Sequence, residues 1–273
     1  MTDTLAATIR FGVDTGTKPE FYQSYVPGEV TQHTGTSEPH EVAIADARRI
    51  DHMFTLDVEG FQLAKNPTRV KDFYDDDEVR RVYNPEIEAI VANAIGARRT
   101  VCFDHTRRSS SAEIRTRHAA RDPAGIAHND YTDWSADKRL GEIMGEEAAA
   151  LKQRRFTIVN TWRTIAGPVE HWPMALCDAT TARPDRILKV TRRTDDRIGE
   201  TMQALFDPGQ KWYWFPHLQP DEILLIKTYD SAPPENENGV RTPFSLHTAF
   251  DNPLAGPDAP PRESIESRLF AFF

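Results

Sequence analysis

The sequence predicts a mainly β protein, an antiparallel sandwich or barrel with flanking α-helices, formed by one continuous domain. Short β-rich runs follow one another from Phe156 onward, separated by Pro, Gly, Asp and Asn, a spacing typical of sandwiches and barrels. Helical periodicity is confined to two segments, around residues 79–95 and 135–155. The 273 residues, 39% of them hydrophobic, contain no internal repeat and no long linker, so one sizeable core is expected.

The first hundred residues are expected to pack on the outside of that core. Residues 1–60 mix short apolar stretches with Gly and Pro, which indicates short strands and turns. Apolar residues then recur at helical spacing over 79–95, where Pro85 restarts the helix and Gly96 ends it. The run TVCFDHT that follows is predicted to be a strand. We therefore assign residues 1–100 to N-terminal strands and helices that pack on the core.

The core itself is assigned to residues 101–273. A polar loop over 107–122 precedes a short apolar strand that leads into His128, and Ser135 is the expected N-cap of an inserted helix at about 135–155. The strands expected after that helix are FTIVNTWRTI, MALCDA, WYWFP, EILLIKTYD, FSLHTAF and SIESRLFAFF. Runs of this length and number indicate an antiparallel core.

Composition excludes several classes of function. The chain has 42 Asp and Glu against 33 Lys and Arg, a net charge of −9, whereas nucleic acids and anionic membranes attract clustered positive charge. No stretch approaches the ~20 apolar residues of a membrane helix, and the N-terminal residues lack the apolar core of a signal peptide. We expect a cytoplasmic protein that acts on a small molecule, with monomer or homodimer left open.

Sulfur chemistry is also excluded as the main activity. Two cysteines, Cys102 and Cys177, cannot form a disulfide framework or a cysteine-based zinc site by themselves.

A candidate metal site is formed by His128, Asp130 and His247. Residues i and i+2 of a strand project from the same face, so His128 and Asp130 can present an imidazole and a carboxylate to one metal ion. His247 lies in another β-like run, FSLHTAF, and adds a second imidazole. Two histidines and one carboxylate on one octahedral face leave three positions open, the arrangement of non-haem Fe(II) oxygenases. An H-x-D triplet alone is weak, because nine histidines and 42 acidic residues produce it by chance.

A candidate carboxylate site follows near the end of the chain. Arg262 and Ser264 share one face of a predicted strand, and a guanidinium beside a hydroxyl suits a carboxylate. With an Fe(II) centre of two histidines and one aspartate, Arg262 would bring a bound 2-oxoglutarate dianion close to neutrality. The alternative is a surface ion pair of Arg262 with Glu263, Glu266 or Asp258.

The order of several motifs resembles a known family. The motifs are FTLDVEGFQL, FDHTRR, HNDYT, NTWR, WYWFP, DEILLIKTYDS, HTAFDNP and DAPPRESIESR, and they extend from about residue 40 to the end. This order is similar to that of the gibberellin desaturase and cephamycin-tailoring (AsaB-like hydroxylase/desaturase) family. These proteins are Fe(II)- and 2-oxoglutarate-dependent oxygenases, found mainly in fungal and bacterial secondary metabolism.

The resemblance implies a double-stranded β-helix, the jelly-roll or cupin-like fold, with flanking helices. It implies that His128, Asp130 and His247 bind Fe(II), and that Arg262 and Ser264 bind 2-oxoglutarate, the co-substrate used with O2. The activity it implies is oxidation of an unactivated C–H bond, by hydroxylation, desaturation or cyclisation. The segment from His247 to Arg262 is longer than is common in related oxygenases. Because of this unusual spacing, Arg268 remains an alternative to Arg262 as the residue that binds the carboxylate.

For further polar residues, the sequence leaves both a binding role and a structural role open. Tyr131 binds 2-oxoglutarate or substrate, or packs as an aromatic of the pocket rim. Arg163 holds a substrate carboxylate, or forms a salt bridge. His105 and Arg107 share a parity and are expected near the pocket mouth, although a hydrogen-bonding role in the core is favoured for His105. Together with Arg108, these arginines favour an anionic substrate, such as a free amino acid or a small carboxylate metabolite.

Two rival functions remain open at this point. One is an Fe(II) oxidase or isomerase that uses the same three ligands without 2-oxoglutarate, and whose activity is therefore indifferent to that acid. The other is a non-catalytic β-sandwich that acts as the partner of a tailoring enzyme, for which His128→Ala would have little effect.

Overall fold

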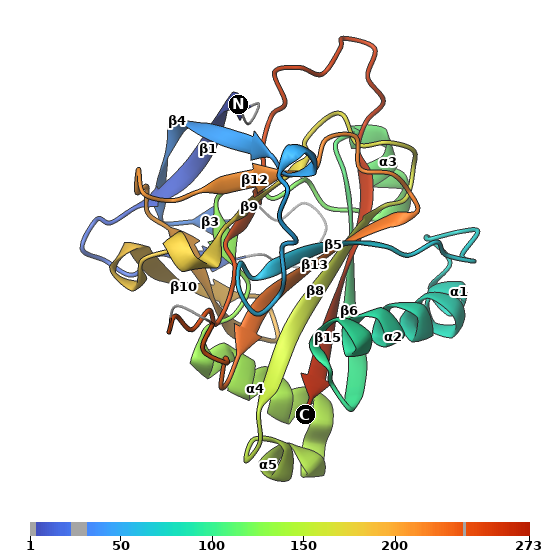
Figure 1. Ribbon diagram of the computed structural model, residues 1–273, viewed down its shortest axis with the longest axis vertical. Helices are drawn as coiled ribbons and strands as arrows, with labels where there is room; N and C mark the ends of the chain where they lie inside the picture. Colours follow the sequence, from blue (N-terminus) through green and yellow to red (C-terminus); the bar gives the residue numbers. More distant parts are fainter. Residues whose placement is uncertain (1–3, 23–31, 237–238) are drawn as a thin grey trace.

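The structure, a computed structural model, describes residues 4–22, 32–236 and 239–273. Its strands form two sheets, with helices on the outside (Figure 1). The sheets face each other, because Met174 and Leu176 of the larger sheet pack in one cluster with Trp162, Leu224 and Ile226 of the smaller one. The expectation of a mainly β fold with a jelly-roll core is confirmed.

The larger sheet has ten strands. In spatial order they are β1 (Thr4–Val13), β4 (Thr36–Asp46), β12 (Trp212–Trp214), β9 (Met174–Cys177), β14 (His247–Ala249), β7 (His128–Asn129), β11 (Ile198–Ala204), β10 (Ile187–Arg193), β2 (Glu20–Tyr22) and β3 (Gln32–His33). Short strands near its centre, β9, β14 and β7, bring segments that lie far apart in the sequence side by side.

The smaller sheet has five strands. Their order is β5 (Phe61–Lys65), β13 (Glu222–Asp230), β8 (Phe156–Thr164), β15 (Glu263–Phe272) and β6 (Arg99–Ser109). β15 is antiparallel to both β8 and β6, so its ten residues are hydrogen-bonded on both sides.

The two faces of the smaller sheet bury different residues. Trp162 and Leu224 point into the space between the sheets, whereas their strand neighbours on the other parity, such as Val159, and Ile265 of β15 point outward. This separation follows from the alternation of side chains along a strand. It decides which polar residues of β6, β8 and β15 can reach a site between the sheets.

A helical layer covers the outward face. It consists of α1 (Asp76–Glu78), the π-helical turn η2 (Val79–Tyr83) and α2 (Asn84–Ile95), which lie beside β6 and β15 in Figure 1. Val79, Tyr83, Ile87 and Val91 recur every four residues and are all fully buried against this face. The predicted end of the helix at Gly96 is confirmed, since Gly96 is its left-handed C-cap with a φ of 66°.

The helix expected from Ser135 starts earlier and is shorter. α4 spans Asp133–Met144, and its N-cap is Thr132, whose hydroxyl accepts a hydrogen bond from the Ser135 amide. Ser135 is the third helical residue and returns a bond to the Thr132 backbone, which completes a capping box. Gly145, at a φ of 54°, interrupts the helix before the short α5 (Ala148–Leu151).

The remaining elements are short. They are α3 (Ala112–His118) and the 3₁₀ turns η1 (Ala47–Arg49), η3 (Gly145–Glu147), η4 (Ala179–Thr181) and η5 (Pro184–Arg186). In the described ranges, every helix is too short or too polar to cross a membrane.

The hairpin β10–β11 has no counterpart among the strands expected from the sequence. Its two strands pair antiparallel over residues 187–204, and β11 pairs in turn with β7. The hairpin therefore borders the strand that carries His128, and it forms part of the site described below.

Candidate metal centre

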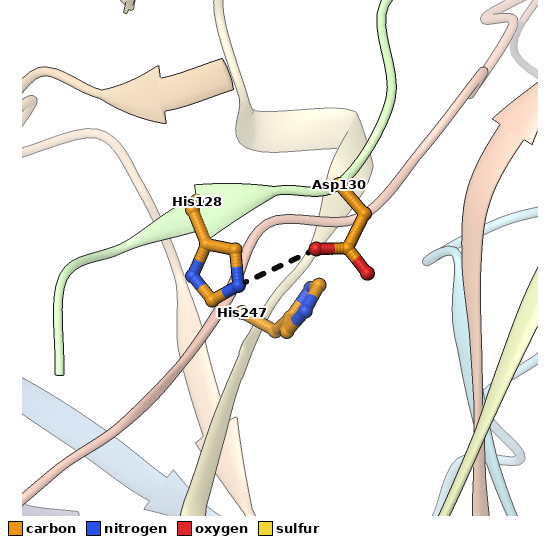
Figure 2. A group of neighbouring side chains, drawn as sticks. All are labelled: His128, Asp130 and His247. Carbon is orange, nitrogen blue, oxygen red and sulfur yellow. Dashed lines mark ion pairs between the residues drawn. The ribbon is translucent and has the colours of Figure 1, made fainter. Parts of the chain in front are cut away.

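Three expected ligands meet in the space between the sheets. His128 on β7 and His247 on β14 lie directly opposite each other in an antiparallel pair, and Asp130 follows β7 immediately. The donor atoms of the three side chains all lie within 4.8 Å of one another (Figure 2). The sequence-based grouping of these residues therefore corresponds to one cluster.

Both imidazoles are oriented by the backbone. Nδ1 of His128 donates to the carbonyl of Ile126 over 2.7 Å, and Nδ1 of His247 faces the carbonyl of Ser245 at 3.4 Å. Because a carbonyl only accepts, Nδ1 carries the proton in each ring and the lone pair lies on Nε2. Nε2 of His247 is buried without a hydrogen-bond partner among the described residues. Such an unsatisfied atom is expected where a metal ion binds.

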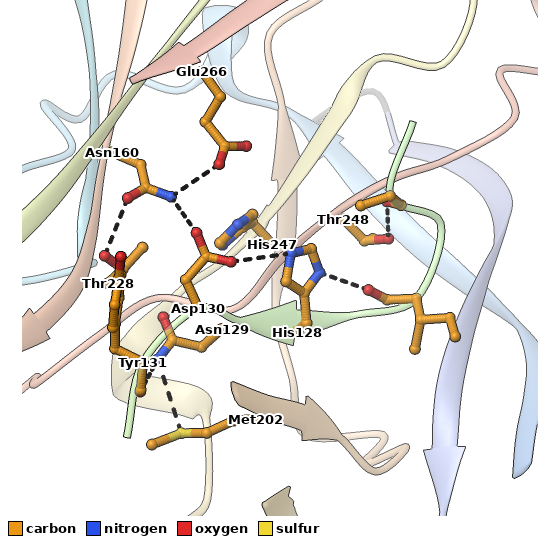
Figure 3. Close-up of polar contacts among 12 residues, drawn as sticks. His128, Asn129, Asp130, Tyr131, Asn160, Met202, Thr228, His247, Thr248 and Glu266 are labelled. Atoms are coloured by element: carbon orange, nitrogen blue, oxygen red, sulfur yellow. Dashed lines mark hydrogen bonds and ion pairs between the residues drawn. The ribbon is translucent and has the colours of Figure 1, made fainter. Parts of the chain in front are cut away.

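The Asp130 carboxylate is held through one oxygen only. Its Oδ2 accepts from Nδ2 of Asn160 at 2.8 Å and from Nε of Arg268 at 2.9 Å. Its Oδ1 is 3.7 Å from Nε2 of His128. The carboxylate thus keeps one oxygen directed at the two imidazoles. Asn160 is itself fixed by Thr228, whose hydroxyl lies 3.3 Å from the Asn160 carbonyl oxygen (Figure 3).

The surroundings of His128 and Asp130 favour the protonation states in which these side chains can bind a metal ion. Burial, with the neighbouring His247, lowers the pKa of His128 to about 4, so this imidazole is neutral at pH 7. Burial opposes ionisation of Asp130, but the Arg268 guanidinium and the two imidazoles hold its pKa well below the usual value. Two imidazoles and one carboxylate fit a divalent iron centre that keeps three positions open.

Arg262 is a buried cation without an acidic partner. Its side chain stacks over the Trp162 ring, 4.8 Å from the centroid, and donates to Ser264 Oγ at 3.1 Å and to the Trp172 carbonyl at 2.6 Å. No carboxylate of the described residues pairs with it. Burial, with the nearby Arg108, lowers its pKa to about 9. A desolvated guanidinium next to a hydroxyl is suited to a carboxylate guest.

The alternative partners of Arg262 are engaged elsewhere. Glu263 accepts from the Tyr74 hydroxyl, and Glu266 accepts from Arg268. Asp258 is exposed in the loop before β15. The surface ion pair considered for Arg262 is therefore not formed.

Arg268, the alternative residue for binding the carboxylate, already has several protein partners. It bonds to Asp130 and Glu266, and its Nη1 lies 3.1 Å from Thr106 Oγ1 and 3.4 Å from Asp104 Oδ2. It therefore positions the Asp130 carboxylate, and Arg262 is the guanidinium that remains available for a co-substrate.

A cavity of about 580 Å³ opens beside the cluster, lined by Asp130, Tyr131 and Arg268. Tyr131 is buried in an apolar group with Phe156 and Tyr229, and burial raises the pKa of its phenol. Tyr131 is thus an aromatic part of the cavity wall, close to the metal ligands.

His105 and Arg107 line the far side of the cavity, at the edge strand β6. His105 Nδ1 lies 2.7 Å from Ser267 Oγ, and Arg107 donates to the Phe73 carbonyl and pairs with Asp76 at 2.7 Å. Both residues are near the mouth, as expected, but their polar groups already have protein partners.

Arg163 is not brought to the site. It points to the outward face, where its guanidinium donates to Asn66 and to the Pro220 carbonyl and lies over the Tyr83 ring at 5.3 Å. Its hydrogen bonds and its full burial give it a structural role that the sequence pattern does not distinguish from substrate binding.

Several cavity residues were not found by sequence reasoning. They include Arg121, Ser135 and Arg139. The β10–β11 hairpin and its turn add Arg192, Thr194, Arg197, Gly199, Glu200 and Thr201. The only sequence signal for that hairpin is the alternation in ILKVTRR, which its charged residues obscure.

Comparison with known proteins assigns the family. A family model described as "Oxidoreductase/YMDC permease-like domain" matches residues 9–272. The Fe(II)/2-oxoglutarate-dependent dioxygenase nvfI of Aspergillus novofumigatus is 33% identical over 268 residues, 95% of this chain and 93% of that protein. The hydroxylase/desaturase CTB9 of Cercospora beticola is 30% identical over 258 residues, covering 86% of this chain and 77% of that protein.

The fold agrees with these sequence matches. A solved structure of a variant of the iron and alpha-ketoglutarate-dependent endoperoxidase NvfI superimposes with a TM-score of 0.86 and 29% identity, covering 100% of this chain and 98% of that one. The chain is therefore an enzyme that uses Fe(II), 2-oxoglutarate and O2, and the non-catalytic alternative is set aside. With its ligand-like cluster, its jelly-roll fold and these relatives, the chain belongs to the Fe(II)- and 2-oxoglutarate-dependent dioxygenases.

Proposed function

We propose that this dioxygenase oxidises an unactivated C–H bond of a small, carboxylate-bearing metabolite, by hydroxylation, desaturation or ring formation. In this proposal His128, Asp130 and His247 bind the iron. The observation that carries it is the convergence of two histidine Nε2 atoms and one carboxylate oxygen in a buried cluster, with one Nε2 left unsatisfied. The names of the relatives include an endoperoxidase and hydroxylase/desaturases, a range of outcomes that starts from the same oxidising centre.

The bound metal, with 2-oxoglutarate and O2, supplies the oxidising power for C–H cleavage. The chain's own contribution is placement. The carbonyls of Ile126 and Ser245 fix both imidazoles with Nε2 inward, and Asn160 and Arg268 fix the carboxylate. These supports limit the reorganisation required when the metal binds.

We assign the distal carboxylate of 2-oxoglutarate to Arg262 and Ser264. Arg262 immediately precedes β15 and donates to Ser264 Oγ of that strand, and the Trp162 ring covers one side of the Arg262 guanidinium. Glu266 accepts a hydrogen bond from Arg268, the residue that also holds Asp130, and its charge opposes the lowering of the pKa of Arg262. Tyr131 is assigned to the wall of the adjoining cavity, in contact with co-substrate or substrate.

An anaerobic titration tests this proposal. Adding Fe(II) and then 2-oxoglutarate to the apo-protein should give the weak visible charge-transfer band of the chelate. His247→Ala should abolish iron binding, and Arg262→Met should weaken 2-oxoglutarate binding while iron still binds. His52→Ala, at an exposed histidine outside the cluster, is the matched control and should leave the band unchanged. Iron binding without a chelate band would favour the 2-oxoglutarate-independent oxidase or isomerase instead.

A further inference from the structure

Two arginines of the cavity have no protein partner for their side chains. In the described part of the chain, the side chains of Arg192 and Arg121 make no hydrogen bond or ion pair, and the guanidinium of Arg192 lies over the Phe21 ring, 5.4 Å from its centroid. The other cavity arginines are paired: Arg139 and Arg197 with Glu142, Arg107 with Asp76, and Arg268 with Asp130.

The backbone holds both unpaired arginines in place. Arg192 lies in β10, opposite Gly199 of β11. The amide of Arg121 donates to the Arg107 carbonyl, and its carbonyl accepts from the Ser109 amide, each at 2.9 Å. One arginine therefore comes from the larger sheet and the other from a segment tied to the smaller sheet, and both line the same cavity.

The cavity wall formed by Arg192 and Arg121 carries positive charge that no ion pair of the described residues neutralises. Burial, followed by the proximity of Arg121, lowers the pKa of Arg192 to about 10, so it remains charged at pH 7. Glu200 also lines the cavity, but its carboxylate is held by Lys18 and by the Thr132 hydroxyl. A ligand anion would therefore relieve the repulsion between Arg192 and Arg121.

The position of this wall relative to the iron ligands suits a substrate. β10 is two strands away from β7, which corresponds to roughly 10 Å at the usual spacing between strands. A cavity of about 580 Å³ is of the size that holds small metabolites. Arg262, assigned above to 2-oxoglutarate, does not line this cavity, so the two anion sites are separate.

We propose that Arg192 and Arg121 bind a carboxylate of the substrate and thereby direct the rest of the molecule toward the metal cluster. Two guanidiniums can each donate parallel hydrogen bonds to a planar carboxylate, a geometry that a single ammonium does not provide. The inference rests on the proposed function, and it moves substrate recognition from Arg163 to the hairpin β10–β11 and the segment before β7.

Binding of small carboxylates to the anaerobic Fe(II) and 2-oxoglutarate complex tests this site. The probes are fluorinated aliphatic and aromatic monocarboxylates, each compared with its own amide by ¹⁹F NMR, and inorganic phosphate is the competitor. We expect the acids to bind in preference to their amides. Arg192→Met and Arg121→Met should each weaken acid binding by roughly 10- to 100-fold, and Arg192→Lys by less, because it keeps the charge without the planar fork.

Arg193→Met is the matched control. Arg193 is the next residue of the same strand, but it pairs with Glu20 and does not line the cavity, so its substitution should leave acid binding unchanged. The chelate band, measured in each variant, separates the two proposals: its absence in the wild type contradicts the proposed function, whereas its retention in Arg192→Met with loss of acid binding supports this inference.

Three results would overturn the inference. In the first, acids and amides bind equally well. In the second, Arg192→Met removes the 2-oxoglutarate chelate band, which would assign these arginines to the co-substrate. In the third, phosphate binds at the wild-type site more tightly than any carboxylate, which would make the site selective for a tetrahedral oxyanion.

Discussion

The inward and outward faces of the five-stranded sheet are both rich in buried polar residues, but only the inward face provides the side chains that hold Asp130 of the ligand cluster. On the inward face, Asn160 and Arg268 hold one oxygen of Asp130, whose other oxygen is directed at the two imidazoles. On the outward face, the two Nη atoms of Arg163 donate to the Pro220 and Asn66 carbonyls, and Nδ1 of His105 lies 2.7 Å from Ser267 Oγ. Burial of a charged group therefore does not by itself identify a functional site, and the ligand cluster is distinguished by its geometry together with the unsatisfied Nε2 of His247.

Substitution of Asp130 is the strongest test of the inward face, because Asp130 is a proposed metal ligand. Asp130→Asn keeps the shape of the side chain but removes the charge, so we expect loss of iron binding, of the chelate band and of turnover. Arg268 retains Glu266 as a partner, so the fold should persist, as checked by circular dichroism. A normal chelate band in this variant would contradict the assignment of Asp130 as a ligand.

Arg268 tests the inward support of the ligand. In Arg268→Met the carboxylate of Asp130 loses its charged donor and keeps only Asn160, and iron affinity should fall by roughly 10- to 100-fold, as is typical for groups that orient metal ligands. Competition with a calibrated chelator under anaerobic conditions measures this change. The same affinity in variant and wild type would show that Arg268 is only a structural counter-charge.

Arg163 tests the outward face. Arg163→Met removes the donors to Asn66 and Pro220 within a fully buried region, so we expect a loss of about 2–3 kcal/mol in the free energy of unfolding. The chelate band and the KM for substrate should stay unchanged, because the side chain faces away from the cavity. Denaturant unfolding and the anaerobic titration measure the two effects separately. A raised KM with unchanged stability would return Arg163 to the substrate site.

The smallest effect is expected in the pH dependence of stability. Burial, with the nearby Arg107, lowers the pKa of His105 from 6.5 to about 4 in the folded protein. Between these values the unfolded chain binds more protons, so the contribution of His105 is complete above pH 6.5 and is lost as the pH falls toward 4. His105→Gln should therefore flatten the decline of the unfolding free energy over this interval. Urea unfolding from pH 4.5 to 7.5 tests it, and an identical slope in both proteins would be the contrary result.

The sequence predicts the grouping of side chains correctly where metal-binding residue types occur at positions that share one face of a strand. The triplet around Asp130 and the distant His247 were grouped from residue type and alternation, and the family resemblance supplied the jelly-roll. The α4 helix begins earlier than the sequence predicts, because Thr132 and Ser135 are both acceptable N-caps and only the observed capping box shows that Thr132 is the one used.

The sequence was insufficient where both faces of a strand are buried. All nine residues of β8 are buried, so neither parity shows the polar signature of a solvent face, and Arg163 could not be assigned to a side. The β10–β11 hairpin was missed for a related reason: one of its faces lines a charged cavity, so its arginines interrupt the apolar pattern. The approach of Arg121 to Arg192 depends on tertiary folding and has no local signal.

The long segment between His247 and Arg262 has a consequence for how this enzyme can diversify. Its ends are fixed independently, His247 by strand pairing and the Arg262 amide by Ser110 Oγ at 2.9 Å, and most of residues 251–261 are exposed. Because closure entropy grows slowly with loop length, insertions and deletions here should be nearly neutral for the site. One residue inserted between Ser264 and Arg268 would instead exchange the two faces of β15. We therefore expect that insertions in the loop, natural or designed, leave the site intact, whereas an insertion a few residues later, within β15, disrupts it.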